Sequence, residues 1–421
     1  MSPTPDTSVL LDHLFRHEAG RMVAHLARIL GPAHLDLAEE TVQEAMLKAL
    51  QTWPYQGLPE NPSAWLFRVA QNSAIDAVRR NRLIGQKTDA VVAEIHRSTK
   101  IEFADPDFEE QLRDDELRLI FMCCHPAIPR DARVALSLKI AGGFSVREIA
   151  RAFLMDEQTI AQRLVRAKRQ IRDQALTLEM PKGPELQKCL DSALEVVYFI
   201  FNEGYTAHEG EDLIRQDLCV EALRLAQRIA FSSIATPAVH ALVAVMAFHA
   251  ARLPARTDEA GELILLEDQD RSRWDQRLIA MGFHHFDRSI CGDQVSEYHV
   301  QAAIAATHAR ADSMESIHWP IILELYDQLF AMNASPIVAL NRAVAIAKVR
   351  GAEEALAAIV PLENDPKLRD YYLYLAVRGH LLLALDRHAD AADCFRNALQ
   401  RRCSDPERRF LLRKLSECEP D

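Results

Sequence analysis

The sequence predicts an all-α protein that is built from several domains. Apolar residues recur at every third and fourth position through most of the chain, while the alternating pattern of a half-buried strand is scarce. The 421 residues exceed the length of one ordinary domain, and 49% hydrophobic with 26% charged residues is typical of a protein that buries several cores. We therefore expect two to four helical domains.

The composition also limits the cellular environment. No apolar run is expected to span a bilayer, and the amino-terminal segment has acidic residues where a secretory signal needs a basic head. The eight cysteines form no Cys-x-x-Cys pair, so we expect reduced and mostly buried thiols and no metal site. These features predict a cytoplasmic protein without a cofactor.

A first module is expected over residues 8–84. Its apolar periodicity predicts helices near 8–30, 36–52 and 62–81. The stretch WPYQGLPEN (53–61) contains two prolines and a glycine, which predict a loop between the last two helices.

An acidic connector and a second module follow. The connector, 85–114, lacks sustained periodicity, and residues 86–116 hold ten acidic and four basic side chains. The second module, 115–175, reads as four helices. Its third helix has Ser145 at the N-cap position and Glu148 at capping-box spacing.

The last two helices of this module have the pattern of a basic helix-turn-helix. From Ser145 to Asp173 there are seven Lys or Arg and four Asp or Glu, so an anionic partner is expected. Four apolar residues form the inner face of the second helix: Ile160, Leu164, Ala167 and Ile171. The outward residues suit base edges and phosphates in a major groove; they are Gln158, Thr159, Gln162, Arg163, Arg166, Lys168 and Arg169.

Both modules resemble the extracytoplasmic-function (ECF) sigma factors of bacterial RNA polymerase. DLAEETVQEAMLKAL (36–50) and NPSAWLFRVAQNSAIDAVRRNR (61–82) are similar to region 2, whose pattern is an acidic D-x-x-Q-E helix followed by A-W-L-x-R-x-A-x-N-x-x-I-D-x-x-R-R. EQTIAQRLVRAKRQIR (157–172) is similar to the region 4 recognition helix, where T-V-x-x-R-L-x-R-A-R is usual. Gln158 stands where many members have glycine, and Ala161 where a polar residue is common, which leaves the promoter sequence open.

The resemblance implies roles for three groups of residues, and no covalent chemistry, so no enzyme activity is expected. The outward face of the 157–172 helix would bind the −35 element. Residues expected to contact core polymerase are Asp36, Glu40, Gln43, Glu44 and Lys48. Residues expected to bind the −10 element, with a base flipped out of the stack, are Tyr55, Gln56, Asn61, Arg68, Asn72, Arg79 and Arg80. The connector would thread the polymerase channel or form a solvated linker.

The remainder resembles the long helical extension of one ECF subgroup. We expect a helical extension over 186–330 and tetratricopeptide-like repeats over 331–418, because 338–359 aligns with 372–395 at an offset of 36. FNEGY (201–205) and EDQDRSRW (267–274) combine carboxylates, arginine and aromatic residues. They are read as helix-linking loops, with a ligand pocket or enzyme site as the alternative.

Three functions are weighed. The leading one is a sigma factor that binds core polymerase and promoter DNA, with a regulatory extension that binds a further protein and helps transcription. The alternative is a helix-turn-helix regulator with a repeat-containing sensor domain. An enzyme that uses the carboxylates of 201–274 is third, since no nucleophile-base pattern or phosphate loop supports it. The AWLFRVAQNSAID helix (64–76) favours the first, because a repressor needs no single-strand module.

Overall fold

The fold is helical throughout the part of the chain that the structure describes. This structure is a computed structural model that describes residues 7–81, 88–99, 106–153, 155–205, 215–366, 368–369 and 371–418. Within these ranges the only β pairing is an isolated bridge between Thr257 and Leu263. The predicted all-α class is confirmed. The chain divides into two compact units, 1–199 and 200–421.

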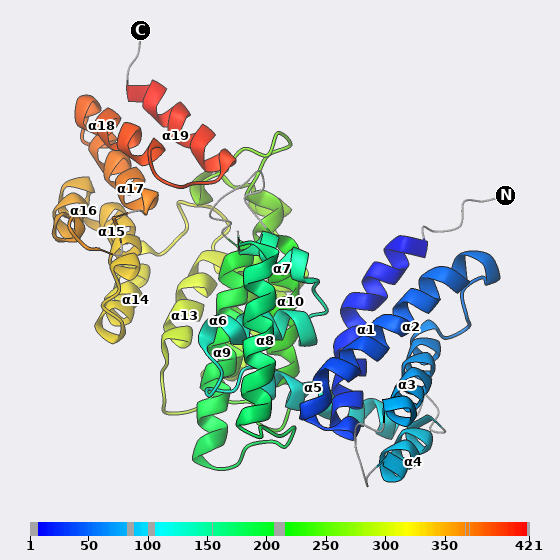
Figure 1. The fold of residues 1–421 in the computed structure, drawn as a ribbon. Helices are drawn as coiled ribbons and strands as arrows, with labels where there is room; N and C mark the ends of the chain where they lie inside the picture. Colours follow the sequence, from blue (N-terminus) through cyan, green and yellow to red (C-terminus); the bar gives the residue numbers. More distant parts are fainter. Residues whose placement is uncertain are drawn as a thin grey trace. The chain divides into compact units, whose positions relative to one another are not determined.

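Unit 1 contains both predicted DNA-binding modules (Figure 1). Its described helices are α1 (Thr7–Leu30), η1 (Pro32–His34), α2 (Leu35–Gln56), α3 (Pro62–Asn81), α4 (Thr88–Thr99), α5 (Pro106–Cys123), α6 (Arg130–Leu136), a π-helical turn η3 (Ser137–Ala141), α7 (Val146–Ala152), α8 (Glu157–Asp173) and the first part of α9 (Pro184–Tyr205). Helices α1, α2 and α3 pack on one another, and α5 packs on α1. Four helices cover the second module, as its sequence pattern predicts.

The predicted loop between α2 and α3 is shorter than expected. Helix α2 continues to Gln56, with Pro54 inside its last turn, and ends at Gly57. Gly57 has a φ of 82°, a backbone conformation that glycine adopts without strain, and its N–H donates to the Trp53 carbonyl. The loop 53–61 is therefore corrected to the few residues that precede α3.

The predicted connector also differs from the structure. Its described residues form α4 and the first part of α5 instead of an irregular strap. Helix α5 begins at Pro106, which suits a first helical position, and Phe108 and Leu112 on it are 4% and 0% exposed. Ile95 on α4 is also fully buried. The burial of these few apolar residues stabilises α4 and α5. Their helical spacing is hard to recognise in the sequence because most of the residues around them are charged.

Unit 2 contains the remaining helices. They are the end of α9, then α10 (Gln216–Ala230), α11 (Pro237–Ala251), η4 (Leu253–Ala255), η5 (Leu266–Asp268), η6 (Arg271–Arg273), α12 (Gln276–Ser289), α13 (Glu297–Arg310), α14 (Trp319–Met332), α15 (Pro336–Arg350), α16 (Ala352–Ile359), η7 (Val360–Leu362), α17 (Tyr372–Leu383), α18 (His388–Leu399) and α19 (Asp405–Cys418). The sequence placed the start of the extension at 186, whereas the structure divides inside α9.

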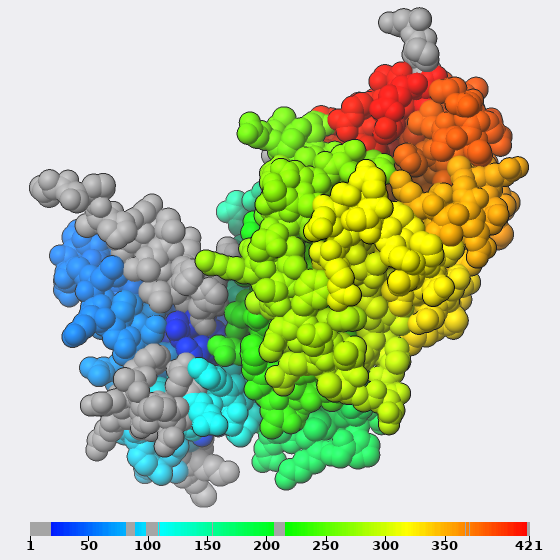
Figure 2. Space-filling view, turned by 180° about the vertical axis from the view of Figure 1, so that it is seen from behind, coloured from blue at the N-terminus to red at the C-terminus, as the bar shows by residue number. Residues whose placement is uncertain are grey.

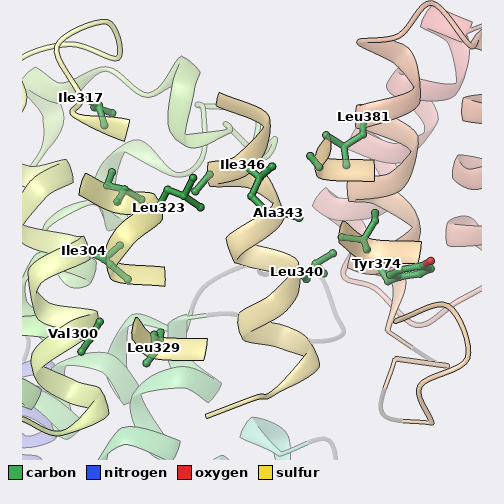
Figure 3. Close-up of a cluster of buried hydrophobic side chains, with 14 of the residues drawn as sticks. Val300, Ile304, Ile317, Leu323, Leu329, Leu340, Ala343, Ile346, Tyr374 and Leu381 are labelled. Carbon is green, nitrogen blue, oxygen red and sulfur yellow. The ribbon is translucent and has the colours of Figure 1, made fainter. Parts of the chain in front are cut away.

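One apolar cluster joins the helices from α13 to α17. Side chains of α13, α14, α15 and α17 point toward one another in the close-up (Figure 3). Ile322 on α14, Ala343 on α15 and Ile359 on α16 are completely buried within it. This cluster is the core on which the carboxy-terminal hairpins are built.

The predicted repeat positions lie in the core. Helices α15 and α16 form one hairpin and α17 and α18 the next, and the helices from α14 to α19 follow one another in chain order (Figures 1 and 2). A Cβ added to Gly379 would lie 2.8 Å from the ring of Phe395. The small residue therefore lets the large one fill the space between two helices. The likeness to tetratricopeptide repeats itself stays a prediction.

One described segment, Pro237–Ala255, has the length and composition of a membrane span. This corrects the expectation that no apolar run reaches that length. Of this segment 78% is buried inside the structure, and α11 is apolar around its whole circumference. Such a helix is typical of the centre of a helical domain.

Gly379→Ala is predicted to destabilise unit 2. Alanine at this position normally favours a helix, but here its Cβ meets the Phe395 ring, and overpacking costs about 1–3 kcal/mol. Urea denaturation followed by circular dichroism should show the loss. Adding Phe395→Leu should restore part of it, because a smaller side chain makes room for the Cβ. A Gly379→Ala variant as stable as the parent would contradict this packing.

Candidate nucleic-acid interface

Local capping fixes both helices of the helix-turn-helix. Ser145 Oγ accepts from the Glu148 N–H at 3.1 Å, and a Glu148 carboxylate oxygen accepts from the Ser145 N–H at 2.8 Å. This confirms the predicted capping box at the start of α7. Asp156 caps α8 by accepting from the Thr159 N–H at 2.7 Å, and its hydrogen bonds to Thr159 lower the pKa of this carboxyl.

The recognition helix α8 has the inner face that the sequence predicts. Its four inner residues are between 0% and 6% exposed: Ile160, Leu164, Ala167 and Ile171. Gln158, Gln162, Arg166 and Arg169 are exposed on the outer side. Thr159 is half-buried, and its hydroxyl donates to Asp156 at 2.6 Å. The outer side thus keeps amide and guanidinium groups accessible to a duplex.

Two of the predicted DNA-binding cations instead form ion pairs with carboxylates of other helices in unit 1. Lys168 Nζ lies 2.6 Å from Asp36 Oδ1 and 2.8 Å from Glu39 Oε2 of α2. Arg163 Nε lies 3.1 Å from Asp131 Oδ2 of α6. In this arrangement Lys168 and Arg163 face protein carboxylates.

The pair of carboxylates changes the electrostatics of Lys168. Burial alone would lower the pKa of this ammonium group, but the neighbouring Glu39 and Asp36 outweigh burial and raise the pKa. Glu39 also forms an ion pair with Lys139, whose Nζ lies 3.0 Å from Glu39 Oε1. Lys168 is therefore charged at physiological pH and is held against α2, away from the exposed face of α8.

The predicted −10 residues lie on α2, the following loop and α3. Tyr55 is 89% exposed at the end of α2, and Gln56 beside it is exposed too. On α3 four predicted residues are exposed: Arg68, Asn72, Arg79 and Arg80. Asn61 has a structural role as well, because its Oδ1 accepts from the Ala64 N–H at 3.0 Å and caps α3.

The predicted polymerase-contact residues are all exposed on α2. They are Asp36, Glu40, Gln43, Glu44 and Lys48. Asp36 also forms the ion pair with Lys168 described above. Lys48 Nζ donates to Ser73 Oγ of α3 at 3.4 Å. Two exposed leucines, Leu47 (56%) and Leu50 (41%), lie on the same helix.

Sequence reasoning missed three residues of this region. Glu39 and Asp131 hold cations of α8 and η3, yet in the sequence they look like ordinary surface acids. Val165 is 64% exposed on α8. Its spacing of three from Gln162 placed it on the outward face, and an apolar side chain there suits a thymine methyl group.

The first part of α9 completes the second module. Arg133 of α6 donates to Ser192 Oγ, which donates to the Cys124 carbonyl. Phe199 stacks on Phe153 with a centroid distance of 6.1 Å. These contacts attach the first part of α9 to α6, to the end of α5 and to the end of α7.

The adjacent thiols in this module are structural. Cys123 and Cys124 are fully buried, and burial raises the pKa of both, that of Cys124 to about 11. Both are therefore protonated and unreactive at physiological pH. Among the described residues no group of three or more His, Cys, Asp or Glu side chains is arranged to hold a metal ion.

Three family models match successive parts of the chain. Residues 14–84 match sigma-70 region 2, and residues 118–171 match sigma-70 region 4. Residues 189–290 match a family of unknown function (DUF6596). The two sigma matches coincide with α1 to α3 and with the helices that lead to the end of α8.

Curated relatives agree with these matches. An uncharacterized protein of Rhizobium meliloti is 38% identical over 383 residues, which cover 91% of this chain and 90% of that protein. The ECF RNA polymerase sigma factor SigE of Mycolicibacterium smegmatis is 28% identical over 163 residues, 38% of this chain and 60% of that protein. No solved structure matches the chain significantly.

A further relative is matched over most of its own length. The ECF RNA polymerase sigma-E factor of Escherichia coli is 30% identical over 141 residues, which cover 31% of this chain and 70% of that protein. The two sigma models match residues 14–84 and 118–171, and the helices described above place both modules in one unit. This chain belongs to the ECF family of RNA polymerase sigma factors.

Proposed function

We propose that this sigma factor binds core RNA polymerase and directs initiation at a narrow set of promoters, without covalent chemistry of its own. The observation that carries the proposal is the outer face of α8. Gln158, Gln162 and Arg166 are exposed together there, while the opposite face is sealed into the core. These residue types suit adenine and guanine edges in the major groove of a −35 element.

The end of α2 and the outer side of α3 support the contact with the −10 element. Tyr55 is an aromatic ring left 89% exposed, and an exposed ring on a surface with basic groups suits stacking of an unpaired base. Such stacking stabilises single-strand binding by about 1–3 kcal/mol per base. Arg68, Arg79 and Arg80 would hold the phosphate backbone beside it.

Helix α2 is the proposed contact with core polymerase. Its exposed side combines Glu40, Gln43 and Glu44 with the exposed leucines 47 and 50. A mixed polar and apolar helical face of this kind suits helix-against-helix recognition. The acidic residues would pair with cations of the polymerase.

We propose that this chain belongs to the subgroup whose extension contains tetratricopeptide-like repeats. We also propose that the extension is required for transcription. Unit 2 holds more than half of the chain, and its stacked hairpins offer a surface of the kind that binds proteins. The shared helix α9 supports a mechanical link, since its first part packs in unit 1 and it continues into unit 2. A regulatory protein bound to the hairpins would act through this helix.

Arg166→Ala is predicted to weaken binding to the −35 element by about 1–3 kcal/mol, the range for a bidentate base contact. Run-off transcription with purified core polymerase on genomic fragments would identify promoters, and titration on one of them would measure the loss. Lys188→Ala is the control, because it removes another exposed charge of unit 1 outside the helix-turn-helix. Equal promoter output from both variants would remove Arg166 from the site.

Glu39→Gln is predicted to increase the affinity of the free protein for promoter duplex several-fold. It removes one of the two carboxylates that hold Lys168 and leaves only the more exposed Asp36, with which a phosphate can compete for this cation, so the slope of log affinity against log salt should steepen by up to about 1. Fluorescence anisotropy over a salt series measures both. Glu40→Gln makes the same charge change on an exposed neighbour and should have a smaller effect. Identical salt slopes for the two variants would show that Lys168 does not bind DNA.

A chain that ends at Tyr205 is predicted to lose most or all transcription in cells. A cut directly after the second module, near residue 180, would also remove Ser192 and Phe199 from unit 1. Ending at Tyr205 keeps these contacts, so circular dichroism should show a folded unit 1. A folded truncated protein as active as the full chain would contradict the positive requirement and favour autoinhibition.

A further inference from the structure

Three arginines of unit 2 gather beside aromatic rings at the end of α11. The guanidinium carbon of Arg256 lies 4.0 Å from the ring centroid of Tyr205. Those of Arg271 and Arg252 lie 4.5 and 5.6 Å from the ring of Trp274. The arginines are half-buried, whereas Trp274, which packs against two of them, is only 4% exposed. We name this group, with His249 and His308, the arginine cluster.

The hydrogen-bond partners of the three guanidinium groups are neutral. Arg252 Nε donates to Gln269 Oε1 at 3.3 Å, and Arg256 donates to the Tyr205 carbonyl. Arg271 Nη1 donates to the carbonyl oxygens of His308 and Ala311 at 2.7 and 2.8 Å. Within the described part of the chain, no carboxylate forms an ion pair with any of them.

The positive charges also repel one another. Burial, and then the charge of Arg256, lower the pKa of Arg252, and burial, and then Arg252, lower that of Arg271. Asp312 is the one carboxylate that acts in the opposite direction on Arg271. Ring faces attract cations but carry no net charge to neutralise them. The cluster therefore holds three like charges close together.

The two histidines add unused hydrogen-bonding atoms. Burial, and then nearby arginines, lower the pKa of His249 to about 3 and of His308 to about 4, so both are neutral at physiological pH. Three buried atoms of the cluster lack a hydrogen-bond partner in the described part of the chain: His249 Nδ1, His308 Nδ1 and Trp274 Nε1. Buried polar groups without a partner are rare in folded proteins and call for an explanation.

A bound anion would account for both features. We propose that the arginine cluster is a binding site for a small polyvalent oxyanion, a phosphate or polycarboxylate compound, in the extension of this sigma factor. Guanidinium groups match the paired oxygens of phosphate and carboxylate, and several of them favour a ligand with more than one negative charge. Indole and imidazole N–H groups can donate to further oxygens of the same ligand.

The site goes beyond the proposed transcription function and does not depend on it. Its residues come from the end of α9, from α11, from the segment after α11 and from α13. An anion held there would tie these elements together, because each contributes a group to the cluster. The extension would then respond to a small molecule as well as to a protein.

Calorimetry and thermal unfolding of the full chain test the site. The probes are pyrophosphate and citrate, each compared with sodium chloride at equal ionic strength. We expect saturable binding of at least one probe and a rise of several degrees in an unfolding temperature. A response to pyrophosphate alone assigns phosphate compounds, and a response to citrate alone assigns polycarboxylates. No response above the chloride control to either probe overturns the proposal.

Two substitutions distinguish a binding site from a structural anchor. Arg252→Gln should weaken anion binding at least tenfold and leave the unfolding temperature without anion unchanged or higher, because it removes one of three repelling charges. Arg277→Gln, an exposed arginine on α12, is the matched control and should retain binding. If Arg252→Gln does not fold, Arg252→Lys keeps the charge and should still weaken binding by loss of the planar fork. Parental anion binding in a folded Arg252 variant overturns the proposal.

Discussion

The buried carboxylate of Asp115 joins the two DNA-binding modules of this sigma factor. Asp115 of α5 is 2% exposed, and its Oδ2 lies 3.0 Å from Arg28 Nε and 3.2 Å from His25 Nδ1, both on α1. An unpaired buried carboxylate costs several kcal/mol, so α5 is stable here only in register with α1. Gly20 of α1 adds a steric condition, since a Cβ there would lie 2.3 Å from the Ala141 carbonyl oxygen. Region 4 is thereby packed against region 2.

This packing divides the basic residues of the recognition helix between two tasks. Lys168 and Arg172 face α2, where Asp36 lies within 3.5 Å of each, whereas Arg166 and Arg169 stay exposed. The two inward ion pairs are not strong individually, because Asp36 is largely solvated and exposed pairs contribute about 0–1 kcal/mol. A promoter phosphate, or a polymerase contact that occupies Asp36, can therefore compete for Arg172, whereas Lys168 is also held by Glu39 at 2.8 Å.

The elements of this fold could be predicted wherever local pattern and tertiary packing agree. Helix α8 is such a case, since its capping residue and its four inner residues are all local features. The connector was missed because α4 and α5 depend on a few buried residues, Ile95 and Phe108 among them, within a strongly charged sequence. For the site, residue types predicted which groups are exposed, but the partner of Lys168 lies 132 positions away and no local pattern encodes it.

The second unit shows why net charge is a poor guide to a local site. Residues 200–421 hold 24 basic and 33 acidic side chains, and such a net negative charge predicts a unit that repels anions. The charges of solvent-exposed carboxylates are screened beyond about 10 Å, so most of these acidic residues have little effect on a distant buried group. Inside the fold, Arg252 and Arg256 follow α11, and Arg271 lies in the later turn η6. Burial of these arginines reduces the screening of their charges by solvent. The acidic surface and the cationic cluster are thus independent properties: the surface disfavours nucleic acid at this unit, and the cluster selects a small anion that can reach it.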